Sequence, residues 1–150
     1  IDRGYLHRYL PPQEPGFDVL TEDGYDAIAH ADLVLSSCGT ANLETALLGT
    51  PFIAFYRLSP LPYYPFHRLV RIHAYSIVNI LAAAPVVPEL IQGSFDSAHL
   101  IRETKALLFS EEKRAKMKLE FQRVAGLFGE DRAAENVARE LEGIVFPPGS

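Results

Sequence analysis

The sequence is poor in cysteine and in basic residues. It has one cysteine, Cys38, and its 14 Lys and Arg residues are outnumbered by 19 Asp and Glu residues, which gives a formal net charge of -5. A lone cysteine cannot form an internal disulfide bond, and no cysteine and histidine pair has the spacing of a zinc site. We therefore expect a reducing compartment, the cytoplasm by default. Binding to nucleic acid is disfavoured, because it needs clustered Lys and Arg.

Long apolar runs, internal repeats and low-complexity linkers are also missing. No run reaches the roughly 18 to 20 apolar residues that a membrane-spanning helix needs, and residues 1–12 lack the pattern of a signal peptide. We expect the protein to be soluble or peripheral to a membrane. Because 48% of its residues are hydrophobic, the chain can form one core. We predict one domain, or part of a larger one, over residues 1–146, with a disordered tail at 147–150.

Apolar periodicity predicts alternating strands and helices in the first part of the chain. A short strand at 17–22 and a helix at 24–31 precede a buried strand at 32–37. A helix at 42–49 and a second buried strand at 51–57 follow. A strand, a helix and a strand at this spacing form the βαβ unit of a parallel sheet. The sequence therefore predicts an α/β fold with a Rossmann-like parallel sheet and flanking helices.

The later part of the chain contains a less regular, proline-rich segment at 59–92 and then clear helical periodicity. Ser97 and Ser110 stand where N-cap residues are expected. The predicted elements are a helix near 63–71, a strand near 75–78, a helix near 80–84, and helices over 97–109, 110–129 and 131–145.

The residues between the two buried strands suggest a ligand site. The sequence SSCGT, residues 36–40, joins the first strand to a helix, whose N-terminal amides and positive dipole end attract phosphate. Ser37 and Thr40 can donate hydroxyl hydrogen bonds, and Gly39 lets a ligand approach the backbone closely. Glu44, about one turn into the helix, could reach a sugar diol. The pattern predicts a nucleotide bound through its diphosphate and ribose, although small residues are also ordinary in tight turns.

The order of these motifs resembles a known family. The small-residue turn, Glu44, Gly49-Thr50-Pro51, Tyr56-Arg57, Asn79 and the sequence VPELIQ are similar in order to the C-terminal half of lipid-A-disaccharide synthases. These are glycosyltransferases of the GT-B class, which has two Rossmann-like domains, and the resemblance covers about residues 1–140. It implies that this chain is the donor-binding part, that it lacks the first strands of its domain and the acceptor domain, and that it is inactive alone.

The resemblance also implies a reaction. A metal-independent, inverting hexosyltransferase without a cofactor would transfer 2,3-diacylglucosamine from its UDP donor to 2,3-diacylglucosamine 1-phosphate. The product would be the lipid A disaccharide precursor. The implied partners are UDP-2,3-diacylglucosamine, a lipid acceptor and the N-terminal acceptor domain, with no nucleic acid. The implied location is cytoplasmic and peripheral to the inner membrane, and a homodimer is left open.

Site residues follow from the same resemblance. Ser37, Gly39 and Thr40 would face the diphosphate, and Glu44 would face the ribose hydroxyls. Without a metal, charge on the leaving UDP must be stabilised by fixed donors, among which Arg57 is a candidate. Asn79 is the predicted catalytic residue, because its amide could orient the donor. The predicted nucleotide-binding residues are Ser37, Gly39, Thr40, Glu44 and Arg57.

Some residues depart from the family pattern and leave alternatives open. Cys38 stands where a serine is usual, so a weaker thiol donor replaces a hydroxyl, although a thiol at a helix N-terminus could also be nucleophilic. The stretch from Ile80 to Pro85 lacks the usual basic residue, and Glu89 could cap a helix instead of touching a ligand. Two other functions therefore stay open: a UDP-N-acetylglucosamine epimerase of the same architecture, and a non-catalytic module that binds a partner through residues 59–92.

Overall fold

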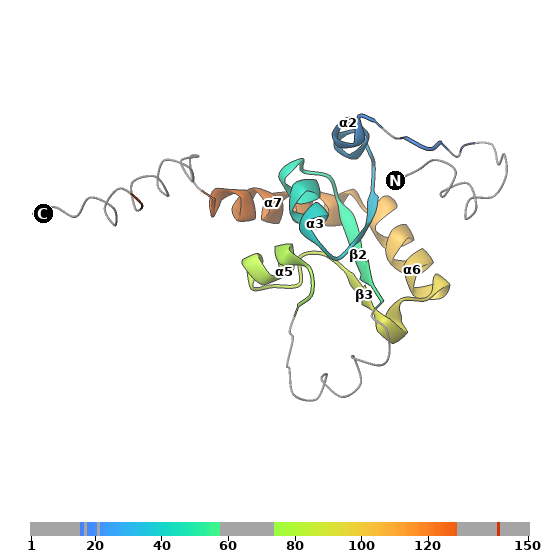
Figure 1. The fold of residues 1–150 in the computed structure, drawn as a ribbon. Coiled ribbons are helices and arrows are strands. Elements are labelled where there is room, and N and C mark those ends of the chain that lie inside the picture. The colour runs from blue at the N-terminus through green and yellow to red at the C-terminus, as the bar shows by residue number, and fades with distance from the viewer. Residues whose placement is uncertain (1–15, 17, 21, 58–73, 129–140, 142–150) are drawn as a thin grey trace, which may run out of the picture.

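The centre of the fold is a parallel sheet of three strands. In the computed structural model, the residues described are 16, 18–20, 22–57, 74–128 and 141. Within them the strands are β1 (Val34–Ser37), β2 (Phe52–Tyr56) and β3 (Glu89–Ile91), in the order β1-β2-β3 (Figure 1). The predicted α/β fold with a parallel sheet is confirmed.

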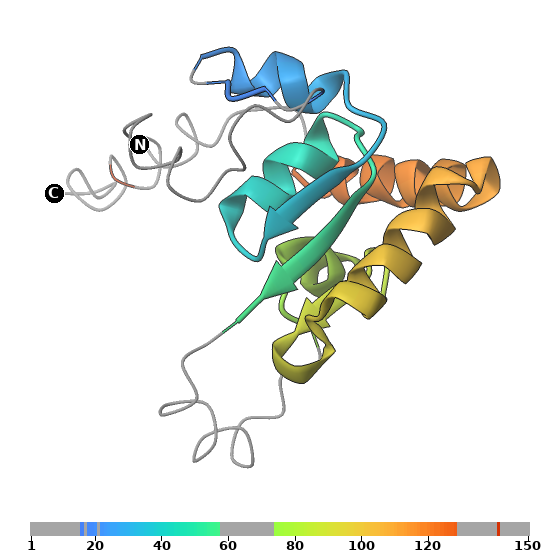
Figure 2. The same cartoon turned by 90° about the vertical axis from the view of Figure 1, so that its right-hand side faces the viewer.

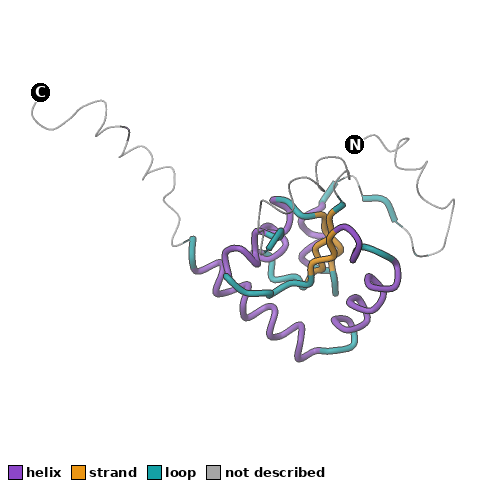
Figure 3. The backbone as a smooth tube through the Cα atoms, turned by 90° about the horizontal axis from the view of Figure 1, so that it is seen from below, coloured by secondary structure: helices purple, strands orange, loops and turns teal. Residues whose placement is uncertain are grey.

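Helices lie on both sides of this sheet. Figure 1 shows α3 and α5 on one side and α6 on the other, and Figure 2 shows α6 nearest the viewer with the sheet behind it. Seen from below in Figure 3, the strands lie in the middle of the surrounding helices. The described helices are α2 (Gly24–Ala29), α3 (Thr40–Leu47), α5 (Ile77–Ala82), the 3-10 helix η1 (Gln92–Ser94), α6 (Ser97–Leu108) and α7 (Glu111–Gly126).

Aromatic contacts join the sheet to the helical layers. The ring of Phe52 on β2 stacks on Phe121 of α7, with ring centroids 5.5 Å apart. Phe55, three residues further along β2, stacks on Phe95, with ring centroids 4.8 Å apart. Phe95 lies just before α6. Because successive side chains of a strand point to opposite faces, these two contacts belong to opposite sides of the sheet. The apolar sequence of β2 is explained by this position, since a central parallel strand is buried on both faces.

Several predicted elements are confirmed. The two strands predicted on either side of α3 are β1 and β2, and α3 begins earlier than predicted, at Thr40. Burial is confirmed for β2, but β1 is an edge strand of the described sheet, in which only Ser36 is buried and Leu35 is exposed. Helices α2, α6 and α7 also lie where the sequence predicts helices. Ser110 is the N-cap of α7, because its hydroxyl oxygen accepts a hydrogen bond from the Lys113 N–H at 3.3 Å.

Other predicted features are wrong. Residues 18–20 form no strand, and the strand predicted at 75–78 is instead the entry to α5, whose N-cap is Ser76. The N-cap of α6 is Asp96 rather than Ser97, because the Asp96 carboxylate accepts a hydrogen bond from the His99 N–H at 2.9 Å. The helix predicted near 63–71, the tail at 147–150 and, apart from Leu141, the helix at 131–145 lie outside the described residues.

Candidate functional site

The turn from β1 to α3 is open to solvent. The Cys38 N–H donates to the Phe55 carbonyl oxygen at 2.9 Å, so pairing between β1 and β2 continues to the turn itself. Gly39 follows in an extended conformation as the N-cap of α3, and a Cβ atom added there would meet no other atom within 4 Å. The side chains of Ser37 and Thr40 are exposed. A ligand can therefore approach the backbone of this turn from solvent.

The buried side chain of Asn42 stabilises the turn by hydrogen bonds to the end of β1. Its side chain is fully buried, and its Nδ2 group donates to the Ser36 Oγ and to the Ser37 carbonyl oxygen, each at 2.9 Å. These bonds tie the first turn of α3 to the last residues of β1. The sequence does not reveal this role, because nothing in the local pattern says that the side chain points toward the strand. Its role in the structure is to fix the turn.

Predicted nucleotide-binding residues gather at this edge of the sheet. Thr40 and Glu44 are four residues apart on α3, so they lie on the same helix face, and both are exposed. Ser37 ends β1 and pairs with Phe55 of β2. The exposed Arg57 follows the end of β2, at the same edge as the turn. The fold therefore brings the carboxyl ends of β1 and β2 together with the start of α3.

Asn79 lies apart from that turn, inside a buried polar network. Its Nδ2 group donates to the Val87 carbonyl oxygen at 2.9 Å and to the Glu89 Oε1 at 2.7 Å. Its Oδ1 accepts hydrogen bonds from the Val86 and Val87 N–H groups, both at 2.9 Å. An amide offers two donors and two acceptor positions, so this side chain has none left for a ligand. The catalytic role of Asn79 stays a prediction, and it would require one of these bonds to be exchanged for a bond to the donor.

Cys38 sits in the turn as an unreactive thiol. Its pKa is raised to about 11, first by burial and then by the negative charge of Glu89. At neutral pH the thiol is therefore protonated, and the thiolate that a nucleophile requires is absent. The alternative of a nucleophilic Cys38 is not supported, and the residue packs against the core as a small half-buried side chain.

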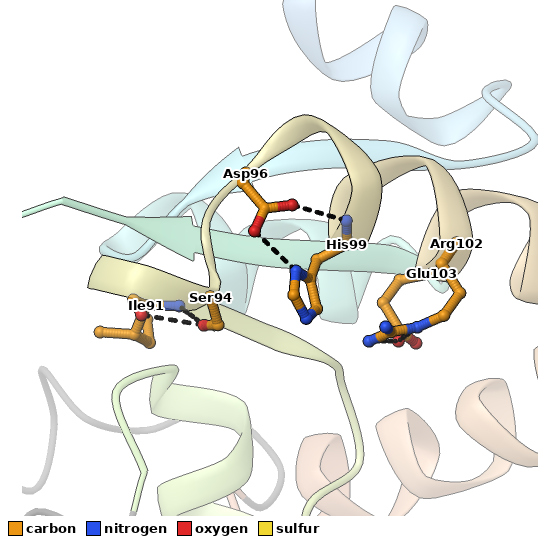
Figure 4. Close-up of polar contacts among 6 residues, drawn as sticks. All are labelled: Ile91, Ser94, Asp96, His99, Arg102 and Glu103. Carbon is orange, nitrogen blue, oxygen red and sulfur yellow. Dashed lines mark hydrogen bonds and ion pairs between the residues drawn. The ribbon is translucent and has the colours of Figure 1, made fainter.

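A cavity of about 1020 Å³ lies between α5, β3 and α6, away from the turn. Asn79 and Glu89 line it, but none of the five predicted nucleotide-binding residues does. Several of its polar side chains pair with each other or with residues beside the cavity (Figure 4). The bonded pairs are Asp96 with His99 at 2.7 Å, Arg102 with Glu103 at 3.0 Å, and Ser94 with the backbone of Ile91 at 2.8 Å. The size of the cavity alone therefore does not make it the better nucleotide site, because the guanidinium of Arg102 in its lining already pairs with Glu103.

One carboxyl group beside the cavity-lining His99 has a shifted pKa. The pKa of Asp96 lies below its usual value because the carboxylate accepts hydrogen bonds from the His99 backbone and then from its side chain. This shift reflects capping of α6, in which the carboxylate satisfies a free amide of the first turn. Among the described residues, no cluster of three or more His, Cys, Asp or Glu side chains could hold a metal ion.

Comparison with known proteins identifies the family. The sequence model described as "Lipid-A-disaccharide synthetase" matches residues 10–140 of this chain. The chain belongs to the lipid-A-disaccharide synthase family. A relative of that name from Solibacter usitatus is 39% identical over 132 residues, which cover 85% of this chain and 35% of the relative. Another, from Syntrophus aciditrophicus, is 38% identical over 124 residues, which cover 83% of this chain and 32% of the relative.

A third lipid-A-disaccharide synthase, from Anaeromyxobacter dehalogenans, is 32% identical over 147 residues, or 97% of this chain and 38% of the relative. The chain thus spans about a third of the length of the synthases it matches. Across the part of the chain that the structure describes, no helix is both long and apolar enough to span a membrane.

Proposed function

We propose that this chain is the donor-binding part of a glycosyltransferase of lipid A biosynthesis. The complete enzyme would transfer 2,3-diacylglucosamine from its UDP donor to 2,3-diacylglucosamine 1-phosphate, with inversion and without a metal ion. Residues 1–146 would form part of the donor domain, and a separate N-terminal domain would hold the lipid acceptor. The enzyme would work in the cytoplasm, peripheral to the inner membrane, and this chain alone would be inactive.

The observation that carries the proposal is the open start of α3 at the carboxyl ends of β1 and β2. Ligands of parallel α/β sheets bind at this edge, where helix amides and dipoles attract phosphate. Thr40 and Glu44 share one exposed face of α3, about one helical turn apart. A diphosphate at the turn and ribose hydroxyls near Glu44 would fit this spacing. The matches to lipid-A-disaccharide synthases favour this function over the epimerase alternative.

Chemistry at this site would depend on fixed donors. When the glycosidic bond to UDP breaks, negative charge grows on the departing phosphate oxygens. Hydroxyl groups of Ser37 and Thr40, the amides of the first turn of α3 and the guanidinium of Arg57 would stabilise that charge without a metal. Asn79 would orient the donor from its position near the start of α5, and Cys38 would contribute little because a thiol is a weak donor.

Calorimetric titration of UDP tests the site in this chain. The parent chain should bind UDP saturably, and Glu44→Ala should weaken binding by at least about tenfold, because a hydrogen bond to a charged group contributes about 1.5 to 3 kcal/mol. Glu112→Ala is the matched control, since Glu112 is an exposed carboxylate at the start of α7. A folded parent that does not bind UDP would contradict the proposal and favour a non-catalytic module.

A further inference from the structure

Glu89 is a carboxylate that is held almost entirely by uncharged N–H groups. Its Oε1 accepts hydrogen bonds from the Ser76 N–H at 2.9 Å, the Tyr75 N–H at 3.1 Å and the Asn79 Nδ2 at 2.7 Å. Its Oε2 lies 3.0 Å from the same Tyr75 nitrogen. None of the ion pairs in the described part of the chain involves Glu89. The carboxylate is therefore bound as a structural acceptor, because three donors point at one of its oxygens.

These bonds connect segments that are far apart in the sequence. Glu89 begins β3, whereas Tyr75 and Ser76 form the entry to α5. Ser76 is fully buried and is the N-cap of α5, although its own hydroxyl has no hydrogen-bond partner among the residues that the structure describes. The capping is thus done by a carboxylate from the sheet, which offers a charged acceptor to two backbone amides. Asn79 extends the connection to the chain just before β3 through Val86 and Val87.

The same carboxylate is connected to the proposed donor site through α5. Helix α5 packs against α3, the helix that begins at the open turn. In the sheet, Glu89 is opposite Ala54 of β2, which is in turn opposite Ser36 of β1, so one strand separates Glu89 from the end of β1. Because Glu89 is bonded to the entry of α5, a shift of Glu89 would change how α5 packs against α3.

We propose that Glu89 is a positioning residue for the donor site: by tying the entry of α5 to β3, it fixes the helix against which α3 and its open turn are packed. This role rests on the proposed function. We expect the position of the Glu89 carboxylate, rather than its negative charge, to matter for donor binding, because all of its hydrogen bonds are to other groups of the protein.

Two conservative variants separate geometry from charge. Glu89→Gln keeps the side-chain length and one oxygen that can accept from Ser76, Tyr75 and Asn79. It replaces the second oxygen, which lies 3.0 Å from the Tyr75 nitrogen, with an NH2 group, and it removes the negative charge. Glu89→Asp keeps the charge and withdraws the carboxylate by one methylene group. Positioning predicts that Glu89→Gln binds UDP within about twofold of the parent, and that Glu89→Asp binds about five- to tenfold more weakly. A role for the charge predicts the opposite order.

Measurements without UDP show whether the connection itself has changed. Amide hydrogen exchange at Tyr75 and Ser76 should be near the parent rate in Glu89→Gln and at least about tenfold faster in Glu89→Asp, because exposed or weakened amides open more often. Alkylation of Cys38, the only thiol in the chain, should reach its half-maximal rate at a lower pH in Glu89→Gln than in the parent. Circular dichroism establishes that both variants are folded.

The outcomes are distinct. A parent that binds UDP, with affinity retained in Glu89→Gln and lost in Glu89→Asp, supports the positioning role. A folded Glu89→Asp variant that binds UDP as tightly as the parent overturns that role and leaves the proposed function standing. A folded parent that fails to bind UDP overturns the proposed function, and it therefore also overturns the role of Glu89 in a donor site.

Discussion

Replacing Asn79 by alanine removes the amide that joins α5 to the chain entering β3. In the parent, that amide donates to the Val87 carbonyl oxygen and to Glu89, and it accepts from the N–H groups of Val86 and Val87. Alanine fits the helix without strain, so the perturbation is the loss of these hydrogen bonds. We therefore expect the change to act on the stability of the free chain, before any ligand is added.

The size of the effect follows from which partners are buried. Val87 is 3% exposed and Asn79 is 5% exposed, so water does not replace the amide at the Val87 N–H and C=O groups. Each buried group left without a partner costs about 1 to 3 kcal/mol, so Asn79→Ala should lower the free energy of unfolding by about 2 to 6 kcal/mol. The total free energy of unfolding of a domain is only about 5 to 15 kcal/mol, so this loss of stability would be large.

Urea denaturation followed by circular dichroism measures this change by linear extrapolation. Ile80→Ala is the matched control, because Ile80 is the next residue of α5 and is 57% exposed. It should change stability by less than about 0.5 kcal/mol. If Asn79→Ala leaves the free energy of unfolding within about 1 kcal/mol of the parent, the amide does not hold the network that the structure shows.

Two further predictions concern the core and the turn. Phe121→Ala should cost about 3 to 5 kcal/mol in urea denaturation, because Phe121 is 1% exposed and stacks on Phe52, whereas Phe109→Ala at an 84% exposed position should cost little. If Phe121→Ala lowers the free energy of unfolding only slightly, α7 does not pack on the sheet as the structure shows. Alkylation of Cys38 should be slow at neutral pH and rise toward pH 11, and the raised pKa should reduce stability as pH rises from about 9 to about 11. A half-maximal rate near pH 8.5 would show an unperturbed thiol.

The sequence predicted the elements around the SSCGT turn because their signals are local. The apolar run of β1 ends at small residues and a glycine, α3 follows at once, and the apolar run of β2 comes next. This local pattern predicts the same β-α-β order that the structure has. Ser110 was also predictable, since its N-cap bond reaches only to Lys113. The open edge at Ser37 and Thr40 follows from the parallel βαβ connection, which places both strand ends at one side.

Features that depend on distant residues were missed. The strand β3 has three residues and a proline before it, which is too short for a periodic signal. Residues Tyr75 to Val78 contain tyrosine, isoleucine and valine, which favour a strand, but Glu89 caps the backbone there and a helix begins instead. For the same reason no local pattern could show that the Asn79 amide is fully occupied, because its partners arrive from residues 86–89.

The two candidate regions for a nucleotide can be distinguished by one measurement. In an NMR titration of the isotope-labelled chain with UDP, backbone amide shifts should change mainly at residues 37–44, the turn and first part of α3. Amides around the cavity between α5, β3 and α6 should change little. Saturable changes concentrated at residues 94–103, with residues 37–44 unaffected, would contradict the central claim that the start of α3 holds the diphosphate and ribose.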